Sequence, residues 1–269
     1  MEWRNILRGM AIGTSDLIPG VSGGTIAVIL GIYDRLIEAI SGVFSRHWKK
    51  HIGFLIPLAI GMGGAILGLS RVIEFLLLNY HAPTQFFFIG LILGIIPLLL
   101  FEFKSRAKMR PVHIVAMIVG TILVASMAVI KPADTAVITD VTMGTALLLF
   151  FSGWLGSMAM LLPGISGSFV LLLIGVYPTV ISALSNLNVI VIGIVGLGVA
   201  VGFLVSSKVI RHLLANYPGM TFSVILGLVI GSLAVVFPGL PETTVMWGLS
   251  IVSFLAGFMV VRLLGKFSV

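Results

Sequence analysis

Long apolar runs alternate with short polar segments along the whole chain. A helix needs about 20 apolar residues to cross a bilayer core. Six uninterrupted runs approach that length: residues 52–70, 84–103, 112–130, 189–206, 220–237 and 244–262. Two further apolar stretches, about 2–44 and 142–184, are each broken by a Pro-Gly pair. The pattern predicts an all-α polytopic membrane protein that forms one membrane domain over residues 1–269.

The two breaks share one sequence pattern. The first reads Pro19-Gly20-Val21-Ser22-Gly23-Gly24 and closes with Gly31-Ile32-Tyr33; the second reads Pro163-Gly164-Ile165-Ser166-Gly167-Ser168 and closes with Gly175-Val176-Tyr177. Proline removes a backbone donor and glycine tolerates positive φ, so both favour the end of a helix. We expect one helix to end at Pro19-Gly20 and a second to begin near Ser22 and continue past Tyr33, with the break repeated at Pro163-Gly164.

The repeated pattern belongs to an internal duplication. The fifteen positions 19–33 match positions 163–177 at an offset of 144 (163 minus 19), and six of them are identical. Residues 70–94 match residues 207–231 at an offset of 137 (207 minus 70), with eleven of 25 identical, including an Asn-Tyr pair. Chance similarity between apolar helices would align Leu and Ile but not these motifs. The sequence therefore predicts two repeats, residues 1–135 and 136–269.

Lys and Arg are concentrated in a few segments, and they set the expected orientation. Cytoplasmic loops of membrane proteins are enriched in these residues. If both termini and the loops 46–50, 104–110 and 208–211 are cytoplasmic, 13 of the 16 basic residues lie on that side. Each broken unit must then enter and leave on one side, as a re-entrant hairpin. One hairpin plus three spans makes an inverted-topology repeat, in which the two hairpins meet near the midplane.

The composition agrees with this class of protein and excludes several functions. Charged residues make up 9% of the chain, against about 25% in soluble domains, and the mean hydropathy is +1.21. The net charge of +7 comes from short segments beside apolar runs, so we expect contact with anionic lipid and not with nucleic acid. The chain has no cysteine and its five histidines lack metal-ligand spacing, so we expect neither a metal nor a cofactor.

Each break also predicts part of an anion site. A helix that begins after such a break presents free N–H groups and the positive end of its dipole, and two such ends facing each other can bind an anion. The candidate ligands for a phosphate headgroup are Ser22, Gly23, Gly24, Thr25, Ser166, Gly167 and Ser168. The alternative is that the motifs only kink the helices and allow close packing. The serines beside the glycines in both copies favour the anion site.

Arg71 and Lys208 occupy matching positions in the two repeats and are candidates for the same headgroup site. Charged side chains within membrane segments are costly and often functional. The alternative places both residues at helix ends, where their side chains would reach the interface.

Asp16 lies three residues before Pro19 in an apolar stretch, and its counterpart in the second copy is Met160. An intramembrane carboxylate is a candidate for coupling transport to a proton or a cation. The alternative is a structural role, in which Asp16 caps a helix or accepts hydrogen bonds.

At the two motifs the chain resembles a known family, the PopT polyprenyl-phosphate translocases of bacteria. The resemblance rests on Asp16 to Thr25 with Gly31 to Tyr33 and on the second motif, and it extends over essentially the whole chain. It implies that the protein returns undecaprenyl phosphate, the lipid carrier of cell-wall sugars, from the outer to the inner leaflet of the bacterial cytoplasmic membrane. The headgroup would pass between the motifs as the two halves rock, while the polyprenyl tail stays in lipid.

Two other functions stay open. A secondary transporter of a small soluble anion would use the same motifs in a site closed to lipid. A lipid-phosphate phosphatase would need a nucleophile or a metal-activated water, and the sequence has no suitable carboxylate cluster or His motif. The chain resembles the undecaprenyl-pyrophosphate phosphatases in plan only and lacks their Glu-rich motif. We expect a transporter and not an enzyme, with a polyprenyl-phosphate lipid as partner and homo-oligomerisation left open.

Overall fold

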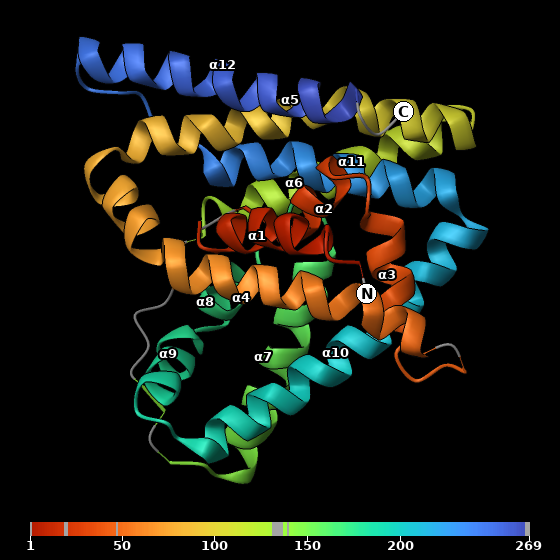
Figure 1. Cartoon of the computed structure of the whole chain (residues 1–269), viewed down its shortest axis with the longest axis vertical. Coiled ribbons are helices and arrows are strands. Elements are labelled where there is room, and N and C mark those ends of the chain that lie inside the picture. Colours follow the sequence, from red (N-terminus) through yellow and green to blue (C-terminus); the bar gives the residue numbers. More distant parts are fainter. Residues whose placement is uncertain (1, 19–20, 47, 131–136, 139, 267–269) are drawn as a thin grey trace.

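All regular structure in the described part of the chain is α-helical (Figure 1). The computed structural model describes residues 2–18, 21–46, 48–130, 137–138 and 140–266. The first half contains α1 (Asn5–Asp16), α2 (Gly23–Ile29), α3 (Tyr33–Ser41), α4 (Trp48–Asn79), α5 (His81–Arg106) and α6 (Pro111–Met127). The second contains α7 (Met143–Leu161), α8 (Gly167–Ile174), α9 (Tyr177–Ser185), α10 (Val189–Asn216), α11 (Pro218–Val236) and α12 (Thr244–Lys266). The prediction of an all-α protein is confirmed.

Six helices of the described residues are long and apolar enough to cross a membrane, namely α4, α5, α7, α10, α11 and α12. Five of them occupy predicted spans, whereas α7 is the first helix of the second broken unit. The span predicted over 112–130 corresponds to α6, which is apolar but has only 17 residues. The short helices α8 and α9 form a pair bent by 112°. The prediction of a polytopic membrane protein is confirmed.

The helices α4 and α10 continue well beyond their predicted spans. We expected a loop at 208–211 and the end of a span before Arg71, but α4 runs to Asn79 and α10 to Asn216. Both expectations are wrong because charged residues such as Arg, Lys and Glu are good helix formers. No glycine or proline interrupts residues 71–79 or 208–216. The polar residues mark the end of the apolar run, and the helix continues through them.

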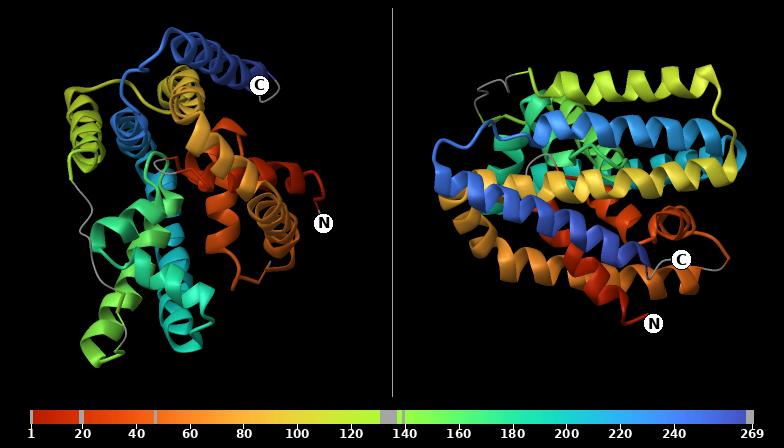
Figure 2. Two further views of the ribbon diagram at one scale, coloured as in Figure 1. Left: turned by 90° about the vertical axis from the view of Figure 1, so that its left-hand side faces the viewer. Right: turned by 90° about the horizontal axis from the view of Figure 1, so that it is seen from above.

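Corresponding helices make corresponding contacts in the two halves. The helix α1 packs along α4, and α7 packs along α10. In the same way α5 packs along α12, α11 packs along α6, and α5 also contacts α11. Figure 2 shows the resulting layer, in which α6, α11, α5 and α12 lie side by side in that order. Helices of the two halves alternate in this layer, so the halves are interleaved.

Close-packed glycines recur at the spacing of the duplication. A Cβ atom added to Gly61 on α4 would lie 2.0 Å from the carbonyl oxygen of Ile6 on α1. A Cβ atom added to Gly198 on α10, 137 positions later (198 minus 61), would lie 2.0 Å from the carbonyl oxygen of Phe150 on α7. Small residues of this kind let membrane helices approach closely. Equally tight glycines occupy the α5–α12 and α11–α6 contacts: Gly90 and Gly227.

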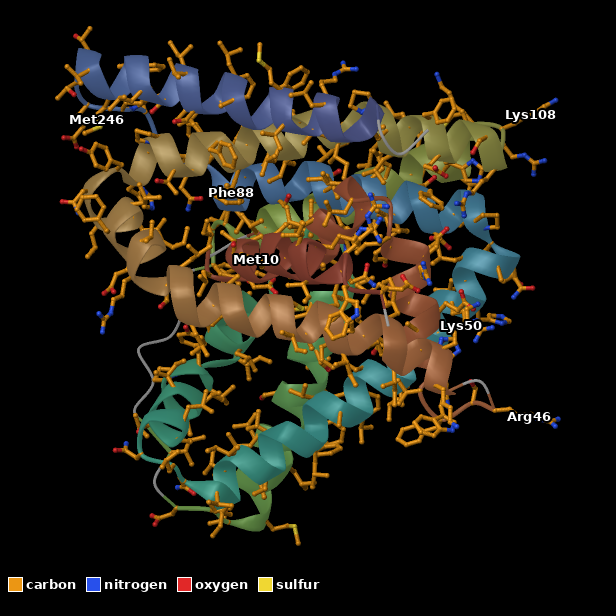
Figure 3. All side chains as sticks on the ribbon, in the orientation of Figure 1. Met10, Arg46, Lys50, Phe88, Lys108 and Met246 are labelled. Carbon is orange, nitrogen blue, oxygen red and sulfur yellow. The ribbon has the colours of Figure 1, made fainter. Side chains whose placement is uncertain are left out.

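The turns between the long helices lie at two ends of the molecule. Figure 1 shows the α4–α5 turn at the left end and the α10–α11 turn at the right end. The labelled basic residues Arg46, Lys50 and Lys108 lie toward the right end (Figure 3). The assignment of residues 1–135 and 136–269 as inverted repeats stays a prediction.

Candidate functional site

The chain leaves the helical conformation at both motifs. The first motif separates α1 from α2, and the second separates α7 from α8. Pro19 and Gly20, the predicted first break, lie outside the described residues. After Pro163, Gly164 adopts a φ of +92°, and a Cβ atom there would lie 2.5 Å from the carbonyl oxygen of Leu228 on α11. Glycine is therefore required at this position by the backbone conformation and by the close approach of α11.

The helix after the first break is shorter than predicted. The helix α2 ends at Ile29 and α3 begins at Tyr33, so the expectation of one helix from Ser22 past Tyr33 is wrong. Gly31 and Gly175 have positive φ values of 65° and 86°, and a left-handed residue after the last turn ends a helix. The helices α2 and α8 therefore have seven and eight residues, and each is too short to cross a bilayer.

Three side chains of the first motif form hydrogen bonds with backbone groups at the second break. The pairs are the Ser22 hydroxyl to the Leu162 carbonyl (3.1 Å), the Gly164 N–H to the Thr25 hydroxyl (2.9 Å) and the Tyr33 hydroxyl to the Leu161 carbonyl (3.0 Å). All three side chains are buried. Backbone groups freed by a break at membrane depth need partners inside the protein. The two motifs therefore meet directly, and the first supplies partners for the second.

The start of α2 is also paired within the protein. The N–H of Gly23 donates to the Asp16 carboxylate at 2.8 Å, and the N–H of Gly24 donates to the Ser22 hydroxyl at 3.1 Å. Ser22 is the N-cap residue of α2. Asp16 thus has the structural role that the sequence left as an alternative, since its carboxylate caps the first turn of α2.

The start of α8 has no such side-chain cap. The hydroxyls of Ser166 and Ser168 instead share a hydrogen bond of 2.9 Å. Both residues line a cavity of about 190 Å³ together with Gly167, Ser157 and Asp16. The first N–H groups of a helix have no partner within that helix. The cavity therefore combines the first turn of α8, three serine side chains and one carboxylate.

Asp16 also borders a second cavity, of about 220 Å³, between the first motif and the surrounding helices. The walls of this cavity are mostly apolar and include Leu58, Met160 and Phe203. The half-buried Asp16 side chain thus borders both cavities, one lined by serines as well as apolar residues and the other mostly by apolar residues. An amphipathic ligand could contact both.

Comparison with known proteins identifies the family. Residues 12–252, which include both motifs, match a family described as undecaprenyl phosphate translocase-like. The chain belongs to this family. A polyprenyl-phosphate transporter of Staphylococcus aureus is 45% identical over 273 aligned residues, which cover 98% of this chain and 96% of that protein. A polyprenyl-phosphate transporter of Vibrio cholerae is 35% identical over 245 residues, which cover 86% and 76%. No solved structure matches the chain.

The family membership confirms the resemblance seen at the motifs. In this undecaprenyl phosphate translocase-like protein, Arg71 and Lys208 lie on exposed faces of α4 and α10. Neither forms an ion pair or hydrogen bond with another residue that the structure describes, and neither lines the two cavities at Asp16. The structure does not bring them to Ser166 and Ser168, so their part in headgroup binding stays a prediction.

A polar cluster beside Tyr33 is not indicated by the sequence pattern. Arg106, at the end of α5, lies 2.9 Å from Asp34 and 3.1 Å from Glu102. These residues and Tyr33 line a cavity of about 200 Å³. From the sequence, Arg106 is one of the basic residues of the loop 104–110, and the acidic residue directly after Tyr33 is a local hint of a partner. Among the described residues, no group of three His, Asp or Glu side chains is placed to hold a metal ion.

Proposed function

We propose that this protein carries a polyprenyl phosphate, with undecaprenyl phosphate as the expected substrate, across the bacterial cytoplasmic membrane. The proposal rests on the cavity at the start of α8, where an uncapped helix end and the hydroxyls of Ser166 and Ser168 lie beside a second broken helix. The names of the Staphylococcus aureus and Vibrio cholerae relatives support the same substrate. Movement from the outer to the inner leaflet would return the carrier for cell-envelope synthesis.

The phosphate headgroup binds in the cavity at the start of α8. Backbone N–H groups and the helix dipole stabilise a phosphate at such a position. Asp16 borders the same cavity, and its carboxylate would repel a phosphate because like charges interact strongly away from bulk water. A proton on Asp16 would remove the repulsion, so that headgroup and proton bind together. Asp16 is therefore the proposed coupling residue as well as the cap of α2.

The hydrogen bonds between the two motifs change when the headgroup site switches from facing one side of the membrane to facing the other. Ser22 donates to the Leu162 carbonyl, and the 144-residue offset assigns Ser166 and Ile18 as the corresponding pair. Ser166 bonds Ser168 in the described state. In the opposite state, Ser166 donates to the Ile18 carbonyl and the Ser22 contact opens. One motif is then closed while the other is accessible, as alternating access requires.

Two arms move against a fixed layer. One arm is the packed pair α1 and α4, the other is the packed pair α7 and α10, and the layer is formed by α6, α11, α5 and α12. Because the layer alternates helices of both halves, the halves cannot rock as separate bodies. The opposite positions of the α4–α5 and α10–α11 turns support an inverted arrangement. The gathering of Arg46, Lys50 and Lys108 at one end supports cytoplasmic termini and basic loops on that side.

Binding of undecaprenyl phosphate to the purified protein tests the proposal. A Ser166→Ala/Ser168→Ala variant should bind at least about tenfold more weakly, because a hydrogen bond to a charged group contributes about 1.5–3 kcal/mol. A Ser152→Ala/Ser223→Ala variant is the matched control, since both hydroxyls are buried and donate to carbonyls of their own helices. Equal affinity of the wild type and the Ser166/Ser168 variant would move the headgroup site elsewhere.

The same preparation separates transport from the other two functions. We propose that the protein is not an enzyme, so that it releases no inorganic phosphate from undecaprenyl phosphate or its pyrophosphate. Release that scales with protein concentration would favour a phosphatase. Saturable binding of a soluble anion, with no binding of the lipid, would favour a soluble-anion transporter.

A further inference from the structure

Two apolar cavities occupy corresponding positions in the two halves. One, of about 230 Å³, lies at the α10–α11 turn, and the other, of about 460 Å³, lies at the α4–α5 turn. Seven of the nine residues that line the first follow a residue that lines the second by 137 positions. Leu213 and Leu76 form one such pair, and Tyr217 and Tyr80 form another. The cavities are therefore part of the duplicated structure.

The backbone of both turns is built in the same way. At each turn an Asn amide donates to a carbonyl four residues earlier at 2.9 Å, and a Thr hydroxyl donates to the Tyr carbonyl at 2.8 Å. The donors are Asn79, Thr84, Asn216 and Thr221. Tyr80 and Tyr217 have nearly equal backbone angles, with φ of −134° and −132°. Polar groups at the turns are thus paired locally, which leaves mainly apolar walls around the cavities.

Each cavity adjoins the elements around the proposed headgroup site. The α10–α11 cavity is also lined by Tyr33 and Leu162, and the Leu162 carbonyl accepts the hydrogen bond from Ser22. The α4–α5 cavity is also lined by Thr14 of α1, two residues before Asp16. Each apolar cavity thus includes a residue that lies next to, or within two positions of, a residue at the motifs.

The two turns lie at opposite ends of the molecule (Figure 1). A lipid that changes leaflets reverses the direction in which its chain extends from the phosphate. A soluble anion has no chain and would need neither cavity. The paired arrangement thus matches a lipid substrate.

We propose that these two cavities hold the isoprene units nearest the phosphate, one cavity for each leaflet. This inference rests on the proposed function. It concerns the polyprenyl chain of the substrate, which the headgroup site does not hold. The chain gains no hydrophobic energy by leaving lipid for a cavity, because lipid tails are equally apolar. Selection for the branched isoprenoid chain comes from close dispersion contacts. The rest of the chain stays in the bilayer.

Leu213→Trp and Leu76→Trp test the proposal by filling one cavity each. The matched controls are Val209→Trp and Val72→Trp on the same helices, also 137 positions apart, whose side chains are 53% and 51% exposed and line neither cavity. Binding to each purified variant is measured with C55 polyprenyl phosphate and with methyl phosphate, which probes the headgroup site alone. A filled cavity should weaken binding of the long-chain ligand about tenfold, or about 1.4 kcal/mol, with methyl phosphate binding unchanged. The controls should match the wild type for both ligands.

The outcomes separate this inference from the proposed function. If the wild type binds C55 polyprenyl phosphate and both filled variants bind it equally well, the chain lies elsewhere and only this inference fails. If the wild type does not bind the lipid, the proposed function fails first. If a phosphatidic acid with straight acyl chains displaces the lipid at equal concentration, the cavities are not isoprenoid sites.

Photocrosslinking of the wild type decides the case in which a filled variant loses both ligands or fails to fold. The probe is a C55 polyprenyl phosphate that carries a diazirine in the isoprene unit next to the phosphate. Adducts on cavity residues such as Leu213 or Leu76 support the proposal. Adducts confined to exposed residues such as Val209 and Val72 overturn it.

Discussion

At the scale of single residues, Asp16 combines a role in the fold with a role in the proposed transport cycle. Its carboxylate accepts the N–H of Gly23 at 2.8 Å and so holds the first turn of α2. The same side chain borders the cavity at the start of α8. Asparagine would keep an acceptor for Gly23 and remove the charge, whereas alanine would remove both. The two substitutions therefore separate the two roles.

Asp16→Asn should leave stability near that of the wild type, whereas Asp16→Ala should lower it by about 1 kcal/mol, as for other lost N-caps. Transport by the wild type should increase as pH falls, because protonation of Asp16 favours the bound phosphate. Transport by Asp16→Asn should lose this dependence. Thermal unfolding and lipid movement in proteoliposomes over a pH series measure both effects. A pH profile of Asp16→Asn equal to that of the wild type would remove Asp16 from coupling.

Thr25 supplies the acceptor for the Gly164 N–H across the two motifs. Thr25→Val keeps the shape of the side chain but leaves a buried donor unpaired, which should destabilise the protein by about 1–3 kcal/mol. Thr221→Val is the matched control because, among the residues that the structure describes, its hydroxyl donates only to the Tyr217 carbonyl of the preceding turn. The control should change stability by less than about 0.5 kcal/mol. Equal unfolding curves for the two variants in detergent would show that the contact contributes nothing to stability.

At the scale of elements, glycines fix how closely the two helices of each arm pack against each other. Gly198→Ala on α10 places a methyl group against the Phe150 carbonyl of α7 and should cost about 1–3 kcal/mol, as overpacking does. Gly196→Ala on the same helix meets no atom within 4 Å and should be neutral or stabilising by up to about 1 kcal/mol. Thermal unfolding of the pair measures the difference. A Gly198→Ala variant as stable as Gly196→Ala would mean that α7 and α10 can separate without loss.

The helix breaks could be predicted from the sequence because their signals are local. Proline and glycine act on the backbone of their own turn, so the interruption at Pro163 and Gly164 follows from the chain itself. The break after α2 is not evident from the sequence, since Gly31 ends the helix only through its left-handed conformation. The ends of α4 and α10 are not evident either, because charged residues end an apolar run without ending a helix.

The partners of each motif could not be predicted, because they depend on contacts between residues far apart in the chain. The Thr25–Gly164 hydrogen bond joins positions 139 residues apart, and the Arg106–Asp34 ion pair joins positions 72 apart. Neither residue type nor spacing indicates such pairs. The sequence could indicate that the two motifs meet, through the duplication and the charge distribution, but not which atoms pair.

At the scale of the whole molecule, the inverted arrangement makes a prediction about sidedness. The chain has no cysteine, so single cysteines give labelling without background. Ser105→Cys and Glu242→Cys place one thiol near each proposed surface, and both positions are exposed. A membrane-impermeant maleimide added to spheroplasts should label Glu242→Cys at once and Ser105→Cys only after permeabilisation. Labelling of both from the same side would contradict the proposed topology.

The hydrogen bonds between the motifs are not shared equally by the two copies. The position that corresponds to Thr25 in the second copy is Phe169, which offers no acceptor for a backbone N–H. A state with the roles of the copies exchanged would therefore lack this contact between the motifs. The empty protein is expected to rest in the described state, latched by a side chain that only one copy has. Such a latch would keep an idle transporter from leaking lipids between leaflets, and the arriving cargo would have to release it.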